Sequence, residues 1–196
     1  MTALALGLTG VVGGVGTWSA FSATTENTNN DFAAGTVVIS DNDANASMFT
    51  MSNMKPGDTQ SRCIKVSYTG SLPSDVTLYG AKTETAGSDG TNDLAVNMTL
   101  KLTRGTDTDH TNLTCDGFIA DAVDYTGGPT GNGVIFDGDL STYPVVGGTH
   151  IADPDISWTN GEFMVYKVDA TLKSTAADAA QGDAVDQSFT WKATNE

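Results

Sequence analysis

The sequence predicts an all-β protein: a jelly-roll-like β-sandwich of about eight strands with long irregular insertions. Residues 94–103 and 163–172 alternate apolar and polar side chains, which is typical of strands with one buried and one solvated face. The 22 glycines and the frequent Thr, Ser, Asn and Asp residues suit short strands joined by turns. No window after Phe21 carries sustained helical spacing of apolar residues.

The chain divides into three parts. Residues 1–20 are apolar and glycine-rich, like the hydrophobic region of a signal peptide, and we expect cleavage near Phe21. The alternative is that this segment is retained in the mature fold. Residues 21–34 are predicted to be an extended, polar N-terminal segment. Residues 35–196 have the size of one domain and are expected to form the sandwich.

The remaining elements follow from shorter runs between turn signals. Pro56 and Gly57 predict a turn, because proline fixes one φ and glycine accepts a positive φ. Residues 104–111 are expected to form a loop, and residues 174–183 a brief helical turn or a loop. Residues 121–154 are rich in Gly, Asp and Pro and predict a long irregular insertion on the surface. The expected strands are residues 36–40, 47–51, 62–68, 75–79, 94–103, 113–119, 163–172 and 186–194.

The segment 94–103 carries the most regular pattern. Five apolar side chains are expected on its buried face, and these are Leu94, Val96, Met98, Leu100 and Leu102.

Acidic residues dominate the charge of the chain. Asp and Glu outnumber Lys and Arg by 24 to 9, giving a net charge of −15. This charge argues against nucleic acid and anionic lipid as partners, and it favours solubility. Two turns carry pairs of hard oxygen ligands of the kind that Ca²⁺ binds, namely Asp41 with Asp43 and Asp137 with Asp139. Plain surface acidity is the alternative, so a calcium cofactor is only a weak candidate.

The two cysteines, Cys63 and Cys115, are expected to form a disulfide, because paired cysteines are usual in exported proteins. The bond would lie either within one chain or between two, and two reduced thiols are the alternative.

Catalytic motifs are absent from the sequence. No HExxH motif occurs, and the two histidines, His110 and His150, are far apart in the chain. One loop carries Asp107, Asp109 and His110, which could cluster as metal ligands. A solvated acidic loop is the alternative. We therefore expect no enzymatic activity from these residues.

Three short blocks carry a family resemblance. The first is WSAFS at 18–22 followed by NDFAAGTV at 30–37, the second is SNMKPGD at 52–58 and the third is FTWKAT at 189–194. Together they resemble the TasA/camelysin family, whereas residues 80–161 carry no such block. The resemblance implies processing near Phe21, secretion to the extracellular matrix or cell surface, and assembly into fibres of the biofilm matrix. Camelysin, the other namesake of that family, is described as a metallopeptidase.

These expectations combine into an assembly hypothesis. The N-terminal segment would add as a donor strand to the next subunit, giving a head-to-tail homopolymer. The chain itself would be the main partner, with other matrix or cell-wall components beside it and no membrane contact after cleavage. For the N-terminal segment, the alternative is a disordered tail. For the protein, the alternatives are a secreted metal-dependent peptidase and a monomeric cell-surface binding module that uses residues 121–154. The donor residues would be Phe21, Ser22, Thr24, Thr25, Phe32, Ala33 and Ala34.

Overall fold

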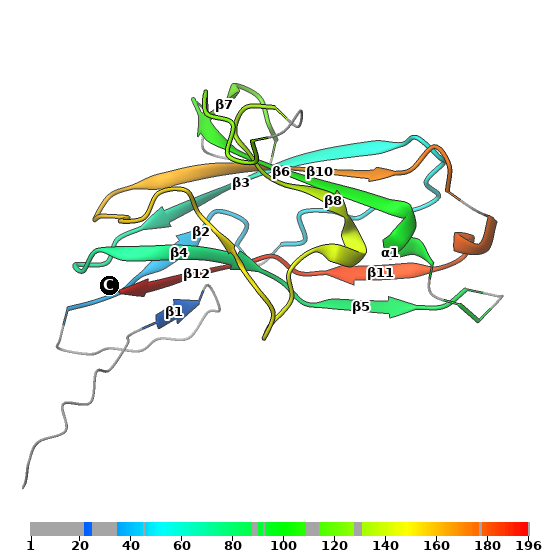
Figure 1. Ribbon diagram of the computed structural model, residues 1–196, viewed down its shortest axis with the longest axis horizontal. Helices are drawn as coiled ribbons and strands as arrows, with labels where there is room; N and C mark the ends of the chain where they lie inside the picture. The colour runs from blue at the N-terminus through cyan, green and yellow to red at the C-terminus, as the bar shows by residue number, and fades with distance from the viewer. Residues whose placement is uncertain are drawn as a thin grey trace, which may run out of the picture.

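Two antiparallel sheets pack face to face in the computed structural model (Figure 1). The structure describes residues 22–24, 35–44, 46–87, 90–91, 93–108, 114–127, 131–176 and 178–195. The prediction of an all-β sandwich is confirmed. The strands outnumber the expected eight because several of them are only two to four residues long.

The smaller sheet has the strand order β1 (Ser22–Thr24), β12 (Thr190–Asn195), β4 (Ser74–Tyr79) and β9 (Ile151–Ala152). The larger sheet has the order β2 (Ile39–Asp41), β3 (Thr59–Tyr68), β10 (Phe163–Leu172), β6 (Met98–Asp107) and β7 (Phe118–Ala120). Beside β7, β8 (Val134–Asp139) also pairs with β6.

A two-stranded ribbon of β5 (Lys82–Thr85) and β11 (Ala184–Gln187) continues the smaller sheet. Its register continues that of β4 and β12, since Tyr79 pairs with Thr190 and Lys82 with Gln187. At the break between them, a Cβ on Gly80 would lie 2.0 Å from the Ser188 carbonyl oxygen, so only glycine fits there. The ribbon is therefore a collinear extension of the β4–β12 pair.

Alternating side chains build the core between the sheets. Ile64, Val66 and Tyr68 of β3 are buried. On β10, where the sequence predicted an alternating strand, the buried face carries Tyr166, Val168, Ala170 and Leu172. The smaller sheet contributes Val76, Leu78, Trp191 and Ala193 to the same cluster.

The predicted strand at residues 94–103 is wrong at its start. Leu94–Asn97 form one helical turn, α1, and Val96 is 46% exposed. The ladder between β6 and β10 ends at the pair Met98 and Leu172, and just before it the Asn97 amide donates locally to the Asp93 carbonyl while the Asn97 carbonyl accepts from the Lys173 amide. The strand also runs on to Asp107, where a loop was expected, because β7 pairs with its end.

The bounds of several other elements differ from the expected bounds by a few residues. Residues 186–194 divide into β11 and β12, and β2 and β7 are shorter than expected. Residues 47–51 form no strand, although Met48 is buried and Phe49 and Met51 pack against the core. The brief helical turn expected within residues 174–183 is present as η2 (Asp178–Ala180), and a further turn, η1 (Leu140–Thr142), follows β8.

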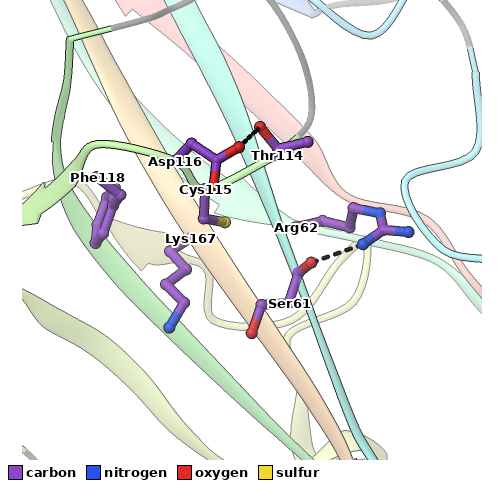
Figure 2. A pocket seen from close by; sticks show the side chains of 7 residues that line it. All are labelled: Ser61, Arg62, Thr114, Cys115, Asp116, Phe118 and Lys167. Carbon is purple, nitrogen blue, oxygen red and sulfur yellow. Dashed lines mark hydrogen bonds between the residues drawn. The ribbon is translucent and has the colours of Figure 1, made fainter.

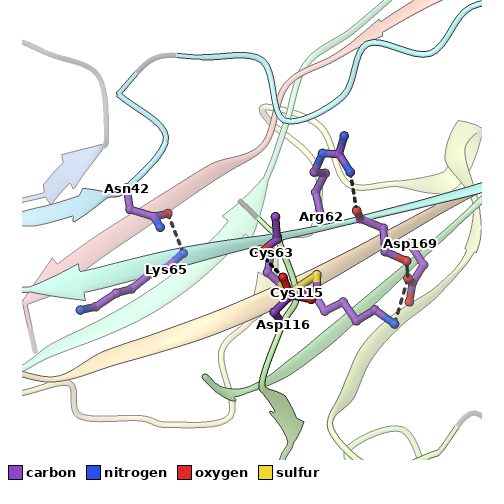
Figure 3. The surroundings of a disulfide bond; sticks show 10 residues. Asn42, Arg62, Cys63, Lys65, Cys115, Asp116 and Asp169 are labelled. Atoms are coloured by element: carbon purple, nitrogen blue, oxygen red, sulfur yellow. Dashed lines mark hydrogen bonds and ion pairs between the residues drawn. A yellow bond between two sulfur atoms is a disulfide. The ribbon is translucent and has the colours of Figure 1, made fainter. Parts of the chain in front are cut away.

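The disulfide joins Cys63 of β3 to Cys115 within the chain, with a Cα–Cα distance of 5.1 Å (Figure 3). It ties the segment before β7 to the outer side of the larger sheet. The two cysteines are 52 residues apart. In the chain-entropy model, closing a loop of this length stabilises the fold by about 4 kcal/mol.

No helix among the described residues is long and apolar enough to cross a membrane. Residues 1–20, the predicted signal segment, lie outside the described residues.

Tyr143 is a buried phenol whose replacement by phenylalanine should stabilise the protein. It is 3% exposed, packs edge-on against Phe136 and Phe189, and its hydroxyl has no hydrogen-bond partner in the described structure. We expect Tyr143→Phe to raise the free energy of unfolding at pH 7 by about 1 kcal/mol, because a desolvated hydroxyl is removed. Urea unfolding would measure this.

The same variant should change the alkaline response. Burial raises the pKa of Tyr143 well above its ordinary value, so the folded chain holds this proton more tightly than the unfolded chain does. That contribution to stability is present below about pH 10 and is lost as the pH rises through the folded pKa. Between pH 10 and 12 the unfolding free energy of the wild type should therefore fall faster than that of Tyr143→Phe. Equal slopes would contradict the burial argument.

Candidate functional site

The edge of β12 is the place where the predicted donor segment meets the fold. β12 pairs with β4 along its whole length, from Thr190 to Asn195. On its other side it pairs, among the described strands, only with β1, in the register Ser22 to Thr194 and Thr24 to Lys192. In Figure 1, β1 lies at the outer border of the smaller sheet. This edge is therefore a surface that accepts an added strand, here from the same chain.

Of the predicted donor residues, Ser22 and Thr24 lie in β1. The others lie outside the described residues, and these are Phe21, Thr25, Phe32, Ala33 and Ala34. Sequence reasoning left the acceptor unassigned, and in this structure Ser22–Thr24 pair with β12 of the same chain.

The chain re-enters the described fold close to where β1 begins. The Thr36 amide donates to Ser71 Oγ at 2.8 Å, and the Ser71 amide donates to the Thr36 carbonyl at 2.7 Å. Ser71 lies in the turn before Ser74, which pairs with Asn195 at the end of β12. β1 runs from this end of β12 toward Lys192, so it begins near the point where Thr36 contacts the turn at Ser71.

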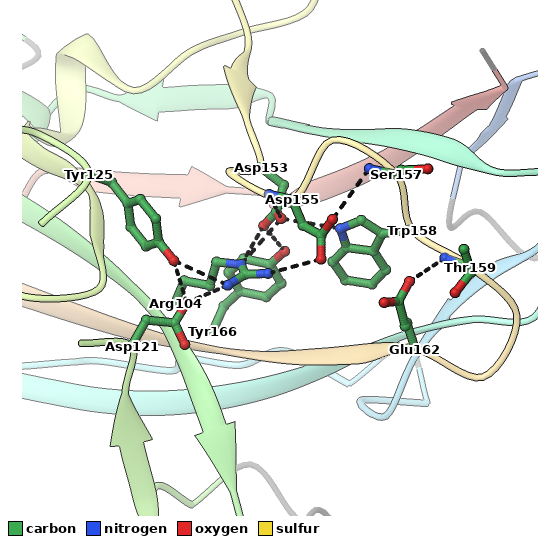
Figure 4. Close-up of polar contacts among 10 residues, drawn as sticks. All are labelled: Arg104, Asp121, Tyr125, Asp153, Asp155, Ser157, Trp158, Thr159, Glu162 and Tyr166. Atoms are coloured by element: carbon green, nitrogen blue, oxygen red, sulfur yellow. Dashed lines mark hydrogen bonds and ion pairs between the residues drawn. The ribbon is translucent and has the colours of Figure 1, made fainter. Parts of the chain in front are cut away.

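A buried arginine organises the opposite side of the sandwich (Figure 4). Arg104 of β6 is 6% exposed, and its Nε donates to both carboxylate oxygens of Asp153, at 3.2 and 3.1 Å. Its Nη1 bonds Asp121, and its Nη2 lies 3.8 Å from Asp155. Burial alone disfavours the charged guanidinium, but Asp153 and Asp121 outweigh it and raise the Arg104 pKa above its ordinary value.

Asp153 is the shared acceptor of this network and is 3% exposed. It accepts hydrogen bonds from Trp158 Nε1 at 3.1 Å, from the Asp155 amide at 3.0 Å and from the Tyr166 hydroxyl at 2.5 Å. Burial, followed by the charge of Asp153, raises the pKa of Tyr166 well above its ordinary value. The network fastens two ends of the irregular insertion to the core, so we regard it as a structural clamp.

Sequence reasoning placed Arg104 in a loop and missed the clamp. The signal was present, because Arg104 continues the alternation of Leu100 and Leu102 onto the buried face. A buried cation requires anionic partners.

The metal candidates are not assembled in the described part of the chain. Asn42, between Asp41 and Asp43, accepts a hydrogen bond from the Lys65 amide, and Asp139 forms an ion pair with Lys173 at 2.7 Å. His150 stacks on Tyr79 with ring centroids 4.2 Å apart, whereas Asp109 and His110 lie outside the described residues. No group of three His, Cys, Asp or Glu residues in a metal-binding arrangement occurs among the residues that the structure describes.

A shallow pocket of about 370 Å³ lies beside the disulfide and contains Arg62 and Lys167 (Figure 2). Arg62 Nη1 donates to the Ser61 carbonyl at 2.9 Å, and Lys167 forms an ion pair with Asp169 at 3.1 Å. Both cations make contacts within the chain, and we assign no ligand to this pocket.

Breaking the clamp should be costly. We expect Arg104→Met to lower the free energy of unfolding by about 3–5 kcal/mol, because it leaves Asp153 buried without its cation. Arg62→Met, which removes a partly exposed cation of β3, is the matched control and should cost less than about 1 kcal/mol. The double variant Arg104→Met with Asp153→Leu should recover part of the loss. Urea unfolding measures all three, and a loss below about 1 kcal/mol for Arg104→Met would contradict the clamp.

Comparison with known proteins places the chain in a family. The family model described as camelysin metallo-endopeptidase matches residues 1–116. This region includes the predicted signal and donor segments, β1 to β6, and both cysteines. No curated protein matches the chain. The chain belongs to the camelysin family.

Proposed function

We propose that this chain is a secreted structural subunit that polymerises head to tail into extracellular fibres of a biofilm matrix. The N-terminal segment of one subunit adds as a strand to β12 of the next. The observation that carries the proposal is the pairing of Ser22–Thr24 with the edge of β12 that faces away from β4. Camelysin-family membership agrees with it, and the fibre itself is our inference from the resemblance and from this edge.

Exchange between subunits is favoured by the small size of β1. Three residues make few ladder bonds, and each hydrogen bond contributes only about 0.5–1.5 kcal/mol net. A strand arriving from a neighbour is not tied to Gly35 of the subunit that accepts it, so we infer that it pairs over a longer stretch. β1 of the same chain thus covers the β12 edge with few hydrogen bonds. The neighbour's strand displaces β1 and forms a longer ladder with β12. Because donor and acceptor are different surfaces, such addition continues as a filament.

Cysteines at paired positions can report which chain supplies the strand. Thr24 and Lys192 are register partners, and Cα atoms of such partners lie about 4.5–5.5 Å apart, within reach of a disulfide. We expect Thr24→Cys with Lys192→Cys to give a ladder of covalent oligomers after assembly, seen on a non-reducing gel. Thr24→Cys with Thr77→Cys is the control, because Thr77 lies on the far side of β12. Filaments that yield only internally linked monomers would refute exchange between subunits.

A metal-dependent endopeptidase is the second candidate, favoured by the description of the matching family model. The described residues supply no zinc ligand set, so we derive no catalytic step from them. Hydrolysis of a fluorogenic peptide by the purified full chain, with and without zinc and chelator, tests this candidate. Chelator-sensitive cleavage that is lost in His150→Ala would favour the peptidase over a purely structural subunit.

A further inference from the structure

A second surface lies where the ribbon of β5 and β11 faces the segment at residues 46–54. It is an open groove of about 920 Å³ that reaches the core between the sheets, where Ile64, Leu100 and Trp191 form part of its wall. Its volume falls within the range of ligand-binding clefts.

The lining of the groove is rich in methionine. Four of the six methionines in the chain line it, together with two phenylalanines, and these are Met48, Met51, Met54, Met98, Phe49 and Phe189. Methionine side chains are flexible and polarisable, so they adapt to apolar side chains of different shapes and are common on peptide-binding surfaces. This lining therefore suits the apolar side chains of a bound peptide.

The rim of the groove is acidic. Asp41, Asp43, Asp183 and Asp186 line it, and no Lys or Arg does so among the described residues. Because the chain carries a net charge of −15, no general positive field offsets these carboxylates. Asp183 accepts hydrogen bonds from the Gly87 and Asp93 amides, whereas Asp186 is exposed, so the negative charge of the rim favours a cationic ligand near Asp186.

One wall of the groove is a strand edge. β11 pairs only with β5 among the described strands, and residues 184–188 line the groove. An extended peptide can add to such an edge through main-chain hydrogen bonds while its alternate side chains enter a neighbouring pocket.

We propose that this groove binds an extended segment of a partner protein in which apolar residues alternate with Lys or Arg. The segment pairs with β11, places its apolar side chains over the methionines and directs its cations toward the aspartates. The N-terminal segment of a second copy fits poorly, because it carries Glu26 and Asp31 and the chain has no basic residue before Lys55. The inference stands apart from fibre formation, which uses the edge of β12.

The test uses a fluorescently labelled nine-residue peptide in which Leu and Val alternate with Lys and Thr. We expect this peptide to bind the full chain at low salt and to weaken as salt is added. The same peptide with Glu in place of Lys should bind at least tenfold more weakly. Fluorescence anisotropy gives both affinities, and a peptide of residues 21–34 of this chain is measured beside them.

Variants locate the site. Asp186 is exposed on β11, and Asp186→Lys should weaken binding of the Lys peptide about threefold to tenfold by reversing one charge. Asp75→Lys is the matched control, because Asp75 is exposed on β4 outside the groove and the net charge changes equally. Met51→Gln should also weaken binding by removing apolar contact, with unfolding curves confirming that each variant folds.

Three results would overturn the proposal: equal binding of the Lys and Glu peptides, equal loss in Asp75→Lys and Asp186→Lys, or tighter binding of the 21–34 peptide. The last would make the groove a contact between copies of this chain. Filament formation by Asp186→Lys is scored separately, so failure of the groove proposal and failure of the fibre proposal are distinguishable.

Discussion

Backbone hydrogen bonding along the β4–β12 ladder is the interaction on which the rest of this sandwich depends. Its inner face supplies Val76, Leu78, Trp191 and Ala193 to the core, and its register continues into β5 and β11. Among the described residues, the other edge of β12 pairs only with the three residues of β1, and the other edge of β11 borders the groove. Unpaired strand edges attract further strands. The ladder that builds the core therefore also provides the surfaces through which we expect the protein to meet other chains.

The opposite side of the molecule is held by side-chain chemistry. The Cys63–Cys115 bond ties the segment before β7 to β3, and the Arg104–Asp153 pair fastens the insertion to β6 and β10. A buried ion pair adds little net stability over an apolar replacement, but removing one partner alone is costly. The fold thus combines a side that is cross-linked by the disulfide and the ion pair with a β12 edge on which the short strand β1 is weakly held. This combination suits our proposal that a subunit exchanges this strand while its core stays intact.

Sequence patterns predicted the parts of the fold that depend on local alternation. The alternation along β3 and β10 was predicted because each strand has one face in the core. The prediction was wrong at Leu94–Asn97, since the end of a strand depends on where its partner ends, and the β6–β10 ladder stops at Met98. Ser22 and Thr24 were predicted as donor residues from a family resemblance, but the β12 edge could not be, because strand order depends on contacts between distant segments. The groove needed the same long-range information, since Met48 and Asp186 are far apart in the chain.

The most direct test of the central claim is negative-stain electron microscopy of the chain beginning at Phe21, beside a version beginning at Gly35. The account predicts filaments from the first and monomers from the second, because removal of residues 21–34 takes away the donor strand and leaves the β12 edge in place. Filaments from both versions would move the cause of assembly to another surface. If the version beginning at Phe21 forms no filaments under any condition of salt, pH or calcium, the proposed structural role is contradicted.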